Sequence, residues 1–590
     1  MSLLPVFKFI RLVVKFYITD TIKTQQPYLV ELSFVPRNRA DMLFQGKIYI
    51  TLDGNYAVQK AVLTLDEAVN LNFLRNMEAT LSFEKAEDGR YRLSNSTLDM
   101  EFALSKNGSG LYGRRVTDIN DYLINQPRPD STYQGPKLEQ KNLKIADSDA
   151  AWDQLRPIPL DNLEADIYKN IDTLQRIPSF RRTMDIATLL LAGYKSFDKF
   201  EIGPVNTFYS FNPVEGFRLR VGGRTTPNLS KRFYMETYAA YGFRDQKWKY
   251  FLSGTYSFNN ESVYHFPLHY MRVSYQKDTK IPGQELQFVQ EDNFLLSFKR
   301  GDNNRWLYNE TYKVEYIKEF ENHFSYQLGF SRWQQQAAGV LAFQRQTAEG
   351  IENIPYINNS EASLELRYAP NEKFYQGKLY RIPIINKYPI FTLRYAAGIK
   401  GLFNGDHEYH HLSGAISKRS YLSQFGYVDW MVDGGYIFGK EIPFALLSLP
   451  RANQTYAYQL NSYNMMNFME FVSDKYVNLN IQYYMNGFLF NKIPLFRKLK
   501  WREVFSFKAL YGGLSDKNNP NINGNNLLFP TNNQGQSISY VIGNTPYMEA
   551  SAGVANIFKL LRVDAVRRLN YLDLPNSPKW GVRFRVKFDF

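Results

Sequence analysis

The sequence predicts an all-β membrane protein: a closed antiparallel transmembrane β-barrel over residues 201–590, behind a small β-rich domain and a short helical linker. Three observations predict it. The 590-residue chain is 16% aromatic, yet its mean hydropathy is −0.41. Strands that alternate aromatic and polar residues give both values at once. Residues 201–590 alternate with a period of two, and no stretch reaches the roughly 18 uncharged apolar residues that a membrane-spanning helix needs.

The alternation is clear from Lys247 to Phe258 and from Val477 to Asn486. Segments of about ten residues match the span of a tilted strand across a bilayer. The pattern predicts sixteen strands, with eighteen as the alternative, because closed single-chain bacterial barrels have an even number. Residues 518–536 do not alternate and should form an extracellular loop. Counting strands back from the C-terminus places residues 438–463 on the periplasmic side.

The last eleven residues give the sharpest signal. One face carries Trp580, Val582, Phe584, Val586, Phe588 and Phe590. Charged residues on the other face would point into a dry core in a soluble sheet, at several kcal/mol each. We therefore expect Phe584, Val586 and Phe588 to face lipid, and the strand to be presented to the barrel-assembly machinery. We expect the cations of the other face to pair with Asp564 and Glu549.

Residues 1–110 read as a β-rich domain of short strands. A strand from Gly46 to Asp53 ends in the sequence Asp53-Gly54-Asn55, which predicts a hairpin into Tyr56–Val58. The pattern suits a small β domain or a half-barrel with one face packed. Because an even number of strands returns the chain to the side it came from, we expect this domain in the periplasm, on the same side as Phe590.

Residues 111–200 form a linker with two predicted helices, at about 160–175 and 178–195. Leu163, Ile167, Ile171 and Leu174 are spaced by four, four and three residues, which places them on one helical face. The first twenty residues of the chain do not resemble a signal peptide, because lysine and arginine interrupt the apolar run. We expect that the true N-terminus is missing.

Composition narrows the chemistry. The chain has no cysteine, which excludes disulfides, thiolate metal sites and cysteine nucleophiles. Within a strand His407 and His411 would lie about 13 Å apart, too far to share an ion. We predict no metal, no cofactor and no enzymatic activity. The net charge of +14 is spread along the chain, which favours lipopolysaccharide phosphates and a polar lumen over nucleic acid.

Two local motifs stand out. The turn Asn212-Pro213-Val-Glu215-Gly216-Phe-Arg218 has a bend bracketed by proline and glycine, with Glu215 and Arg218 close enough to pair. It suits either a plain tight connection or a lumen-facing plug that fixes the start of the barrel. The basic stretch 497–502 suits an interface where cations and Trp501 meet lipid headgroups.

Four stretches resemble a known family: Phe44–Ile50, Asn212–Arg218, Asn491–Glu503 and Asn556–Asp564. The chain is similar to an uncharacterised family of Bacteroidota outer-membrane proteins with an N-terminal carboxypeptidase-regulatory-like domain, a periplasmic middle region and a C-terminal β-barrel. The resemblance implies that the signal peptide and the regulatory-like domain are missing here. The C-terminal part also resembles, distantly, the BamA/TamA-type surface-antigen barrels.

Two functions follow from these expectations. The first is a non-enzymatic barrel of the cell outer membrane that acts in outer-membrane biogenesis, protein assembly or secretion with periplasmic or outer-membrane protein partners. The second is a porin-like or transport barrel for small solutes. In both, the direct contacts are outer-membrane lipids, lipopolysaccharide and the assembly machinery.

Overall fold

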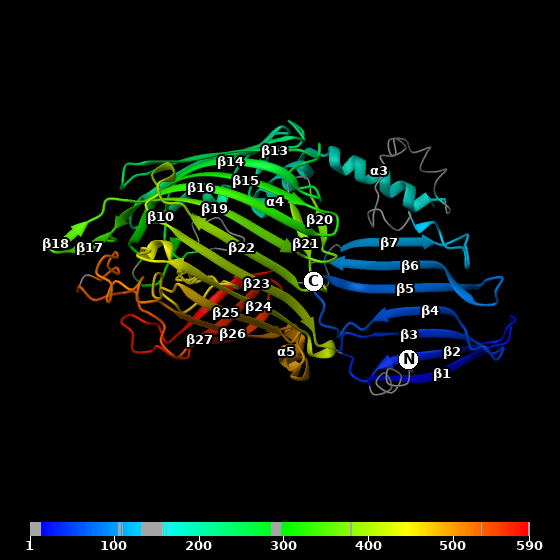
Figure 1. Cartoon of the computed structure of the whole chain (residues 1–590). Helices are drawn as coiled ribbons and strands as arrows, with labels where there is room; N and C mark the ends of the chain where they lie inside the picture. The colour runs from blue at the N-terminus through cyan, green and yellow to red at the C-terminus, as the bar shows by residue number, and fades with distance from the viewer. Residues whose placement is uncertain are drawn as a thin grey trace.

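Two antiparallel sheets make up most of the computed structural model (Figure 1). The structure describes residues 13–39, 41–103, 108, 110–130, 156, 159–160, 162–284, 297–301, 303–377, 380–532 and 534–587. Within those ranges, no helix combines the length and the apolar character needed to cross a membrane.

The first sheet is a seven-stranded meander in chain order. Its strands are β1 (Val14–Ile22), β2 (Leu29–Pro36), β3 (Phe44–Thr51), β4 (Val58–Leu65), β5 (Leu74–Lys85), β6 (Tyr91–Ala103) and β7 (Gly110–Asp118). The predicted hairpin is confirmed, because β3 pairs with β4 and Gly54 takes a φ of 86° in the turn. One face of the sheet is apolar, as in the cross-strand pair Phe16 and Phe34.

Two helices, α3 (Asn162–Arg176) and α4 (Pro178–Ala192), lie close to the predicted ranges. Pro178 stands in the first turn of α4, where its missing N–H would have had no intrahelical partner. Gly193 ends α4 in the left-handed conformation at a φ of 79°. Ile167 and Ile171 on α3 are exposed. The spacing therefore predicts the helix, but not burial of its apolar face.

The second sheet contains eighteen strands. They are β8 (Lys195–Ser196), β9 (Phe200–Ile202), β10 (Tyr209–Asn212), β11 (Gly216–Thr225), β12 (Phe233–Gly242), β13 (Trp248–Ser257), β14 (His269–Lys280), β15 (Arg305–Glu319), β16 (Phe324–Gly339), β19 (Ile357–Tyr368), β22 (Ile390–Gly398), β23 (Tyr409–Tyr421), β24 (Tyr427–Gly439), β25 (Lys475–Tyr484), β26 (Arg502–Gly513), β27 (Tyr547–Ile557), β28 (Leu561–Arg568) and β29 (Trp580–Val586). Two separate hairpins are β17 (Gln344–Thr347) with β18 (Gly350–Asn353), and β20 (Lys373–Gln376) with β21 (Arg381–Ile384). The short helices are η3 (Val205–Thr207), η5 (Leu402–Asn404), η6 (Ser423–Phe425), η7 (Phe444–Leu446), η8 (Phe490–Lys492) and α5 (Pro494–Leu499).

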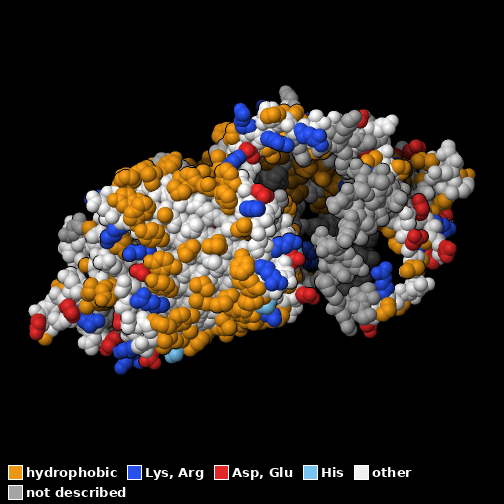
Figure 2. Space-filling view, turned by 90° about the horizontal axis from the view of Figure 1, so that it is seen from above, with side chains coloured by type: hydrophobic (Ala, Val, Ile, Leu, Met, Phe, Trp, Pro, Cys, Tyr) orange, Lys and Arg blue, Asp and Glu red, His pale blue; other side chains and the backbone are white. Residues whose placement is uncertain are grey.

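The second sheet is apolar outside and polar inside. On β13, Trp248, Tyr250 and Leu252 are exposed, whereas Lys249 and Ser253 on the opposite face are buried. Figure 2 shows apolar side chains spread over much of this outer wall. Soluble monomers rarely expose apolar patches of more than a few hundred Å². The period-two alternation in the sequence therefore corresponds to a real division between two faces.

The connections alternate between two ends of the second sheet. The near end is where β29 finishes, and it also holds the connection 485–501 between β25 and β26. The far end holds the connections 440–474 and 514–546. The expectation that residues 438–463 share a side with the C-terminus is therefore wrong. A single strand, β25, separates the connection 440–474 from the connection 485–501. A count from the C-terminus that adds a second strand there moves every earlier connection to the opposite end of the sheet.

The first sheet is attached to the near end. Asn72 and Asn556 hydrogen-bond through their side-chain amides, and both are buried. Lys500 donates to the carbonyl of Leu71 at 2.8 Å, and Arg502 donates to the carbonyl of Asn70 at 2.7 Å. The loop between β4 and β5 therefore meets two turns of the second sheet. The basic stretch at 497–502 thus binds protein at two of its positions, where we expected lipid headgroups.

Pairing along the second sheet follows chain order from β10 to β29, which is sixteen strands. Both β9 and β10 pair with β11, one at each end of that strand. The strand order continues from β29 to β8 and β9, and β9 pairs with β11, but no pairing register among the described residues joins β29 directly to β10 or β11. A closed barrel of sixteen strands therefore stays a prediction.

Candidate functional site: a buried ion cluster and a segment inside the second sheet

Asn212 closes the turn between β10 and β11. Its Oδ1 accepts hydrogen bonds from the N–H groups of Val214 (3.0 Å) and Glu215 (2.8 Å). Its Nδ2 donates to the Glu215 carboxylate at 2.6 Å. Gly216 follows with a φ of 67°, and a Cβ at this position would lie 2.9 Å from the Cβ of Arg244. The turn therefore requires both the asparagine side chain and the glycine.

The same turn starts a buried ion cluster. Arg218 donates to the two carboxylate oxygens of Asp278 at 2.7 and 3.0 Å, and lies 3.2 Å from Glu215. Lys249 contacts Glu215 at 2.6 Å and Asp245 at 2.7 Å. Arg218 and Glu215 are both 0% exposed. Three carboxylates thus face two cations in a largely buried site.

The side chains of this ion cluster link the start of β11 to β13 and β14, two strands that also pair with each other through their backbones. The carbonyl of Pro213 also accepts a hydrogen bond from Arg244 at 2.9 Å, which ties the turn to the connection after β12. Bidentate arginine–carboxylate contacts are geometrically specific as well as strong. The turn therefore makes more side-chain contacts than a plain tight connection needs, and the lumen-facing plug stays a prediction.

A second site lies on the inward face of β25 to β29, where residues 440–474 pack against the sheet. We call this stretch the inner segment. It leaves β24 and returns to β25 at the far end. Met465, Met466, Phe471 and Val472 within it are 0% exposed. Protein therefore fills this part of the interior.

Two buried charges hold the backbone of the inner segment. Lys508 of β26 donates to the carbonyls of Gln459 (2.9 Å) and Ser462 (2.5 Å). Glu549 of β27 accepts from the N–H groups of Asn464 (2.8 Å) and Met465 (3.0 Å). Burying a charge is costly unless hydrogen bonds compensate it, and here the inner segment supplies them. Segment and wall therefore stabilise each other.

At Phe584 the inner segment also pairs with the edge of β29 opposite β28, the edge on which the strand order places β8. The N–H of Phe584 donates to the carbonyl of Tyr456 at 2.9 Å. The N–H of Tyr458 donates to the carbonyl of Phe584 at 2.7 Å, and Ala457 and Phe584 form a parallel bridge. An open strand edge is a template for pairing with another chain. At Phe584 a piece of the same chain takes that position.

The last strand has its apolar side chains on the exposed face: Trp580, Val582, Phe584 and Val586. Arg583 is buried on the inward face and donates to the carbonyl of Asn464 at 2.7 Å. Glu549 acts on Arg583 electrostatically without forming an ion pair with it, and the expected pairing of Arg583 with Asp564 is wrong. Asp564 pairs with Arg562, two positions earlier on the same strand and face, at 2.6 Å. Phe588 and Phe590 lie outside the described residues.

Two family models match the chain. The "Family of unknown function (DUF5686)" matches residues 14–122, and the "Family of unknown function (DUF5686) C-terminal domain" matches residues 192–518, more than half of the 590 residues. This chain belongs to the DUF5686 family. No curated protein matches its sequence.

Solved structures share little with this DUF5686 protein. BamA from Haemophilus ducreyi, lacking POTRA domains 1–3, is 10% identical with a TM-score of 0.40, over 67% of this chain and 71% of that one. CdiB from Escherichia coli is 9% identical (TM-score 0.37; 65% and 61%), and CdiB from Acinetobacter baumannii is 8% identical (0.31; 65% and 58%). A TM-score below 0.5 does not establish a shared fold.

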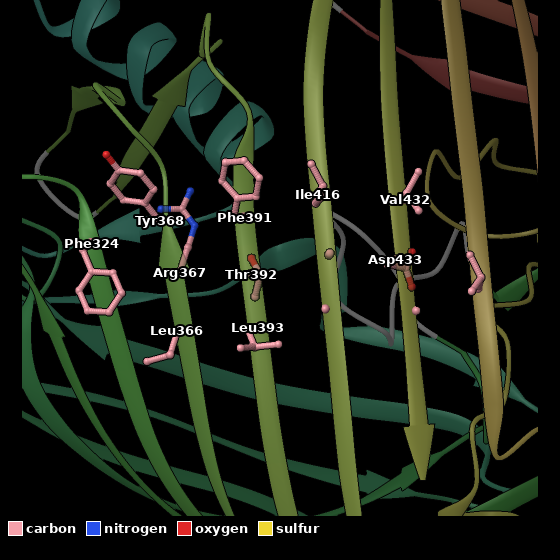
Figure 3. Close-up of a pocket in the computed structure, with 14 residues that line it drawn as sticks. Phe324, Leu366, Arg367, Tyr368, Phe391, Thr392, Leu393, Ile416, Val432 and Asp433 are labelled. Atoms are coloured by element: carbon pink, nitrogen blue, oxygen red, sulfur yellow. The ribbon is translucent and has the colours of Figure 1, made fainter.

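The histidines and a hollow on the outer wall are weaker candidates for a functional site in this DUF5686 protein. His410 hydrogen-bonds to Tyr395 at 2.7 Å, and the described residues include no cluster of three or more His, Asp or Glu that could hold a metal. On the outer wall, Gly414 faces Gly434 across β23 and β24, beside an apolar hollow of about 540 Å³ (Figure 3). Ligand sites need a few placed polar groups for specificity, and this hollow is lined mostly by apolar side chains.

The inner segment is what the sequence did not reveal. Its residues show neither strand nor helix periodicity, so the sequence predicts only a connection between strands there. One signal is present: adjacent Met465 and Met466 lie among asparagine, glutamine and tyrosine, a composition that suits a packed loop better than a solvated one.

Proposed function

We propose that this protein is a non-enzymatic β-barrel of the cell outer membrane that acts in outer-membrane biogenesis, protein assembly or secretion with envelope partners. The apolar outer wall of the second sheet supports a membrane position, because soluble monomers rarely expose so much apolar surface. In lipid only helices and closed barrels satisfy their backbone polar groups internally, so a sheet in that position has to be a closed barrel. In this proposal the near end and the first sheet face the periplasm, and the far end faces outward. A Bacteroidota source and an additional regulatory-like domain belong to the same proposal.

The observation that carries the proposal is the inner segment. A porin-like barrel needs a continuous aqueous path, and large barrels provide one when nothing fills them. Here Lys508 and Glu549 fix a stretch with fully buried Met465 and Phe471 across the interior. Because the interior is filled, we favour a role in the assembly or secretion of other macromolecules at the membrane. The alternative, passage of small solutes through an open channel, has less support.

The attached first sheet supports the same choice. Its loop between β4 and β5 is held at the near end by buried asparagines and by two cations that bind backbone carbonyls. A folded module fixed at one mouth can hold a partner in a defined position relative to the membrane. Barrel-assembly machinery during insertion and lipopolysaccharide afterwards are the further partners that we propose.

Ion conductance separates the two functions. The purified full chain in a planar bilayer should give no stable conductance steps, whereas the double variant Lys508→Met/Glu549→Gln, which loosens the inner segment, should give intermittent ones. Stable, large steps from the unaltered chain would instead favour the porin-like alternative. Copurification from native outer membranes in mild detergent would then identify the partners.

A further inference from the structure

A cavity of about 720 Å³ opens at the far end of the second sheet. Four stretches that are distant in sequence line it: β17, the connection before β23, the start of the inner segment and the connection after β26. Backbone contacts join these walls, because Arg345 bridges Leu527 and the N–H of Glu441 donates to the carbonyl of Lys517 at 3.2 Å. The cavity is therefore built by the fold.

Four cations line this cavity: Arg345, Lys400, Lys440 and Lys517. None of them makes an ion pair with any residue that the structure describes, although Arg218 and Lys249 inside the second sheet are fully paired. The Nε of Arg345 is also shielded from water without a hydrogen-bond partner in the described part of the chain. Buried polar atoms normally have partners, so an orphaned one calls for an explanation such as a ligand.

One wall of the cavity shows how these cations converge. Burial lowers the pKa of His407, Asp406 opposes this, and Arg345 and Lys400 lower the pKa further. Two cations from different stretches thus act on one imidazole. An anion bound between Arg345 and Lys400 would reduce the repulsion between these two cations and the protonated form of His407.

The other lining groups suit hydroxyls. Asp406, Glu408 and Glu441 are exposed carboxylates in the same cavity, and the Asn525 amide lies beside Glu441 with Nδ2 at 3.5 Å from Oε1. Carboxylates accept hydrogen bonds and amides both accept and donate them. A ligand that carries phosphate and several hydroxyls would use both sets of groups.

Aromatic side chains lie just inside the rim on the outer wall. Tyr395, Tyr436 and Phe438 are exposed there, and the ring centroids of Tyr436 and Phe438 are 4.3 Å apart. In membrane barrels, girdles of aromatic residues mark the level of the headgroups. The four cations of the cavity follow this aromatic group toward the far end. In the orientation proposed above, that is the level of the lipid phosphates.

We propose that the cavity binds a phosphorylated saccharide, with Arg345, Lys400, Lys440 and Lys517 on the phosphate and the carboxylates on sugar hydroxyls. The inference rests on the proposed function, since it takes the far end to lie at the outer leaflet. A membrane glycolipid headgroup and a free sugar phosphate share this chemistry, and the experiment distinguishes them.

The first arm uses glucosamine 1-phosphate and glucosamine as probes, titrated against the folded full chain in detergent and followed by ligand-observed NMR. The double variant Lys440→Gln/Lys517→Gln should bind the phosphate at least about tenfold more weakly, through loss of charge-assisted hydrogen bonds. Lys579→Gln makes the same kind of change at the far end outside the cavity and should bind normally. Measurable binding of both probes with equal affinity, or full binding of glucosamine 1-phosphate by the double variant, would overturn the proposal.

The second arm uses nanodiscs that contain either lipid A or its dephosphorylated form, with retained lipid counted by native mass spectrometry. Retention of lipid A alone, lost in the double variant, assigns the site to a membrane headgroup. Binding of glucosamine 1-phosphate without lipid A retention assigns it to a free ligand, and failure of both arms overturns it. Conductance is measured separately, so an open pore would remove the proposed function and leave this site standing.

Discussion

Replacing Arg218 with methionine should destabilise the folded protein more than any other single change in the ion cluster. The substitution keeps the bulk of the side chain and removes both hydrogen bonds to Asp278, at 2.7 and 3.0 Å, and the contact to Glu215. Lys249 would then be the cluster's remaining cation, and because it contacts only Glu215 and Asp245 among the carboxylates, Asp278 would lose its ion-pair partner. Breaking a buried pair by removing one partner costs about 3–5 kcal/mol, because the remaining charge is uncompensated. A typical domain has only about 5–15 kcal/mol of stability, so the loss should be large.

Urea titration of the folded protein in vesicles, read by heat-modifiable gel mobility, measures this loss. Arg218→Met should lower the free energy of unfolding by about 3–5 kcal/mol. Arg244→Gln, which removes an exposed contact to the same turn, should change it by less than about 1 kcal/mol. The double variant Arg218→Met/Asp278→Asn should lose less than the sum of its single changes, because the two residues interact. A loss below about 1 kcal/mol for Arg218→Met would refute the reasoning.

Three further outcomes are expected. Gly216→Ala should lower the free energy of unfolding by about 1–3 kcal/mol because its φ is 67°, whereas Gly254→Ala, whose added Cβ meets no atom within 4 Å, should be nearly neutral in the same titration. Asn72→Ala should speed proteolytic release of the first sheet without changing the heat-modifiable mobility of the rest; an unchanged cleavage rate would count against the junction. Phe584→Arg should block assembly, since a cation on the lipid face costs about 2–4 kcal/mol near the midplane, while Arg585→Gln should assemble; normal folding of Phe584→Arg in outer-membrane fractions would reverse the assigned facing.

The sequence predicts those parts of the fold that depend on local periodicity. The alternation around Lys249 separates exposed from buried positions correctly, because each strand repeats the same division between its faces. The helices at 162–176 and 178–192 follow from their spacing, with Pro178 and Gly193 at their ends. The face of Ile167 and Ile171 is exposed, because periodicity indicates a helix but not its neighbours.

Long-range partners could not be predicted in the same way. The distance in sequence between Arg218 and Asp278 is sixty residues, and only the order of strands brings them together. The sequence predicts Asp564 as a counter-charge for the cations of the last strand; it does lie opposite Arg583, but it pairs with Arg562 on its own strand. The inner segment has no period at all, so its position inside the second sheet depends on contacts such as those of Lys508.

A disulfide across the edge of β29 tests most directly whether the inner segment lies inside the second sheet. The chain has no native cysteine, and Ala457 and Phe584 are bridge partners, so Ala457→Cys/Phe584→Cys places two thiols at positions where a disulfide can form. In outer-membrane fractions the folded double variant should cross-link under mild oxidation and shift in gel mobility. The pair Ile522→Cys/Phe584→Cys, with one thiol on an exposed far-end loop, should not. Folded protein that fails to cross-link at 457 and 584 would contradict the account.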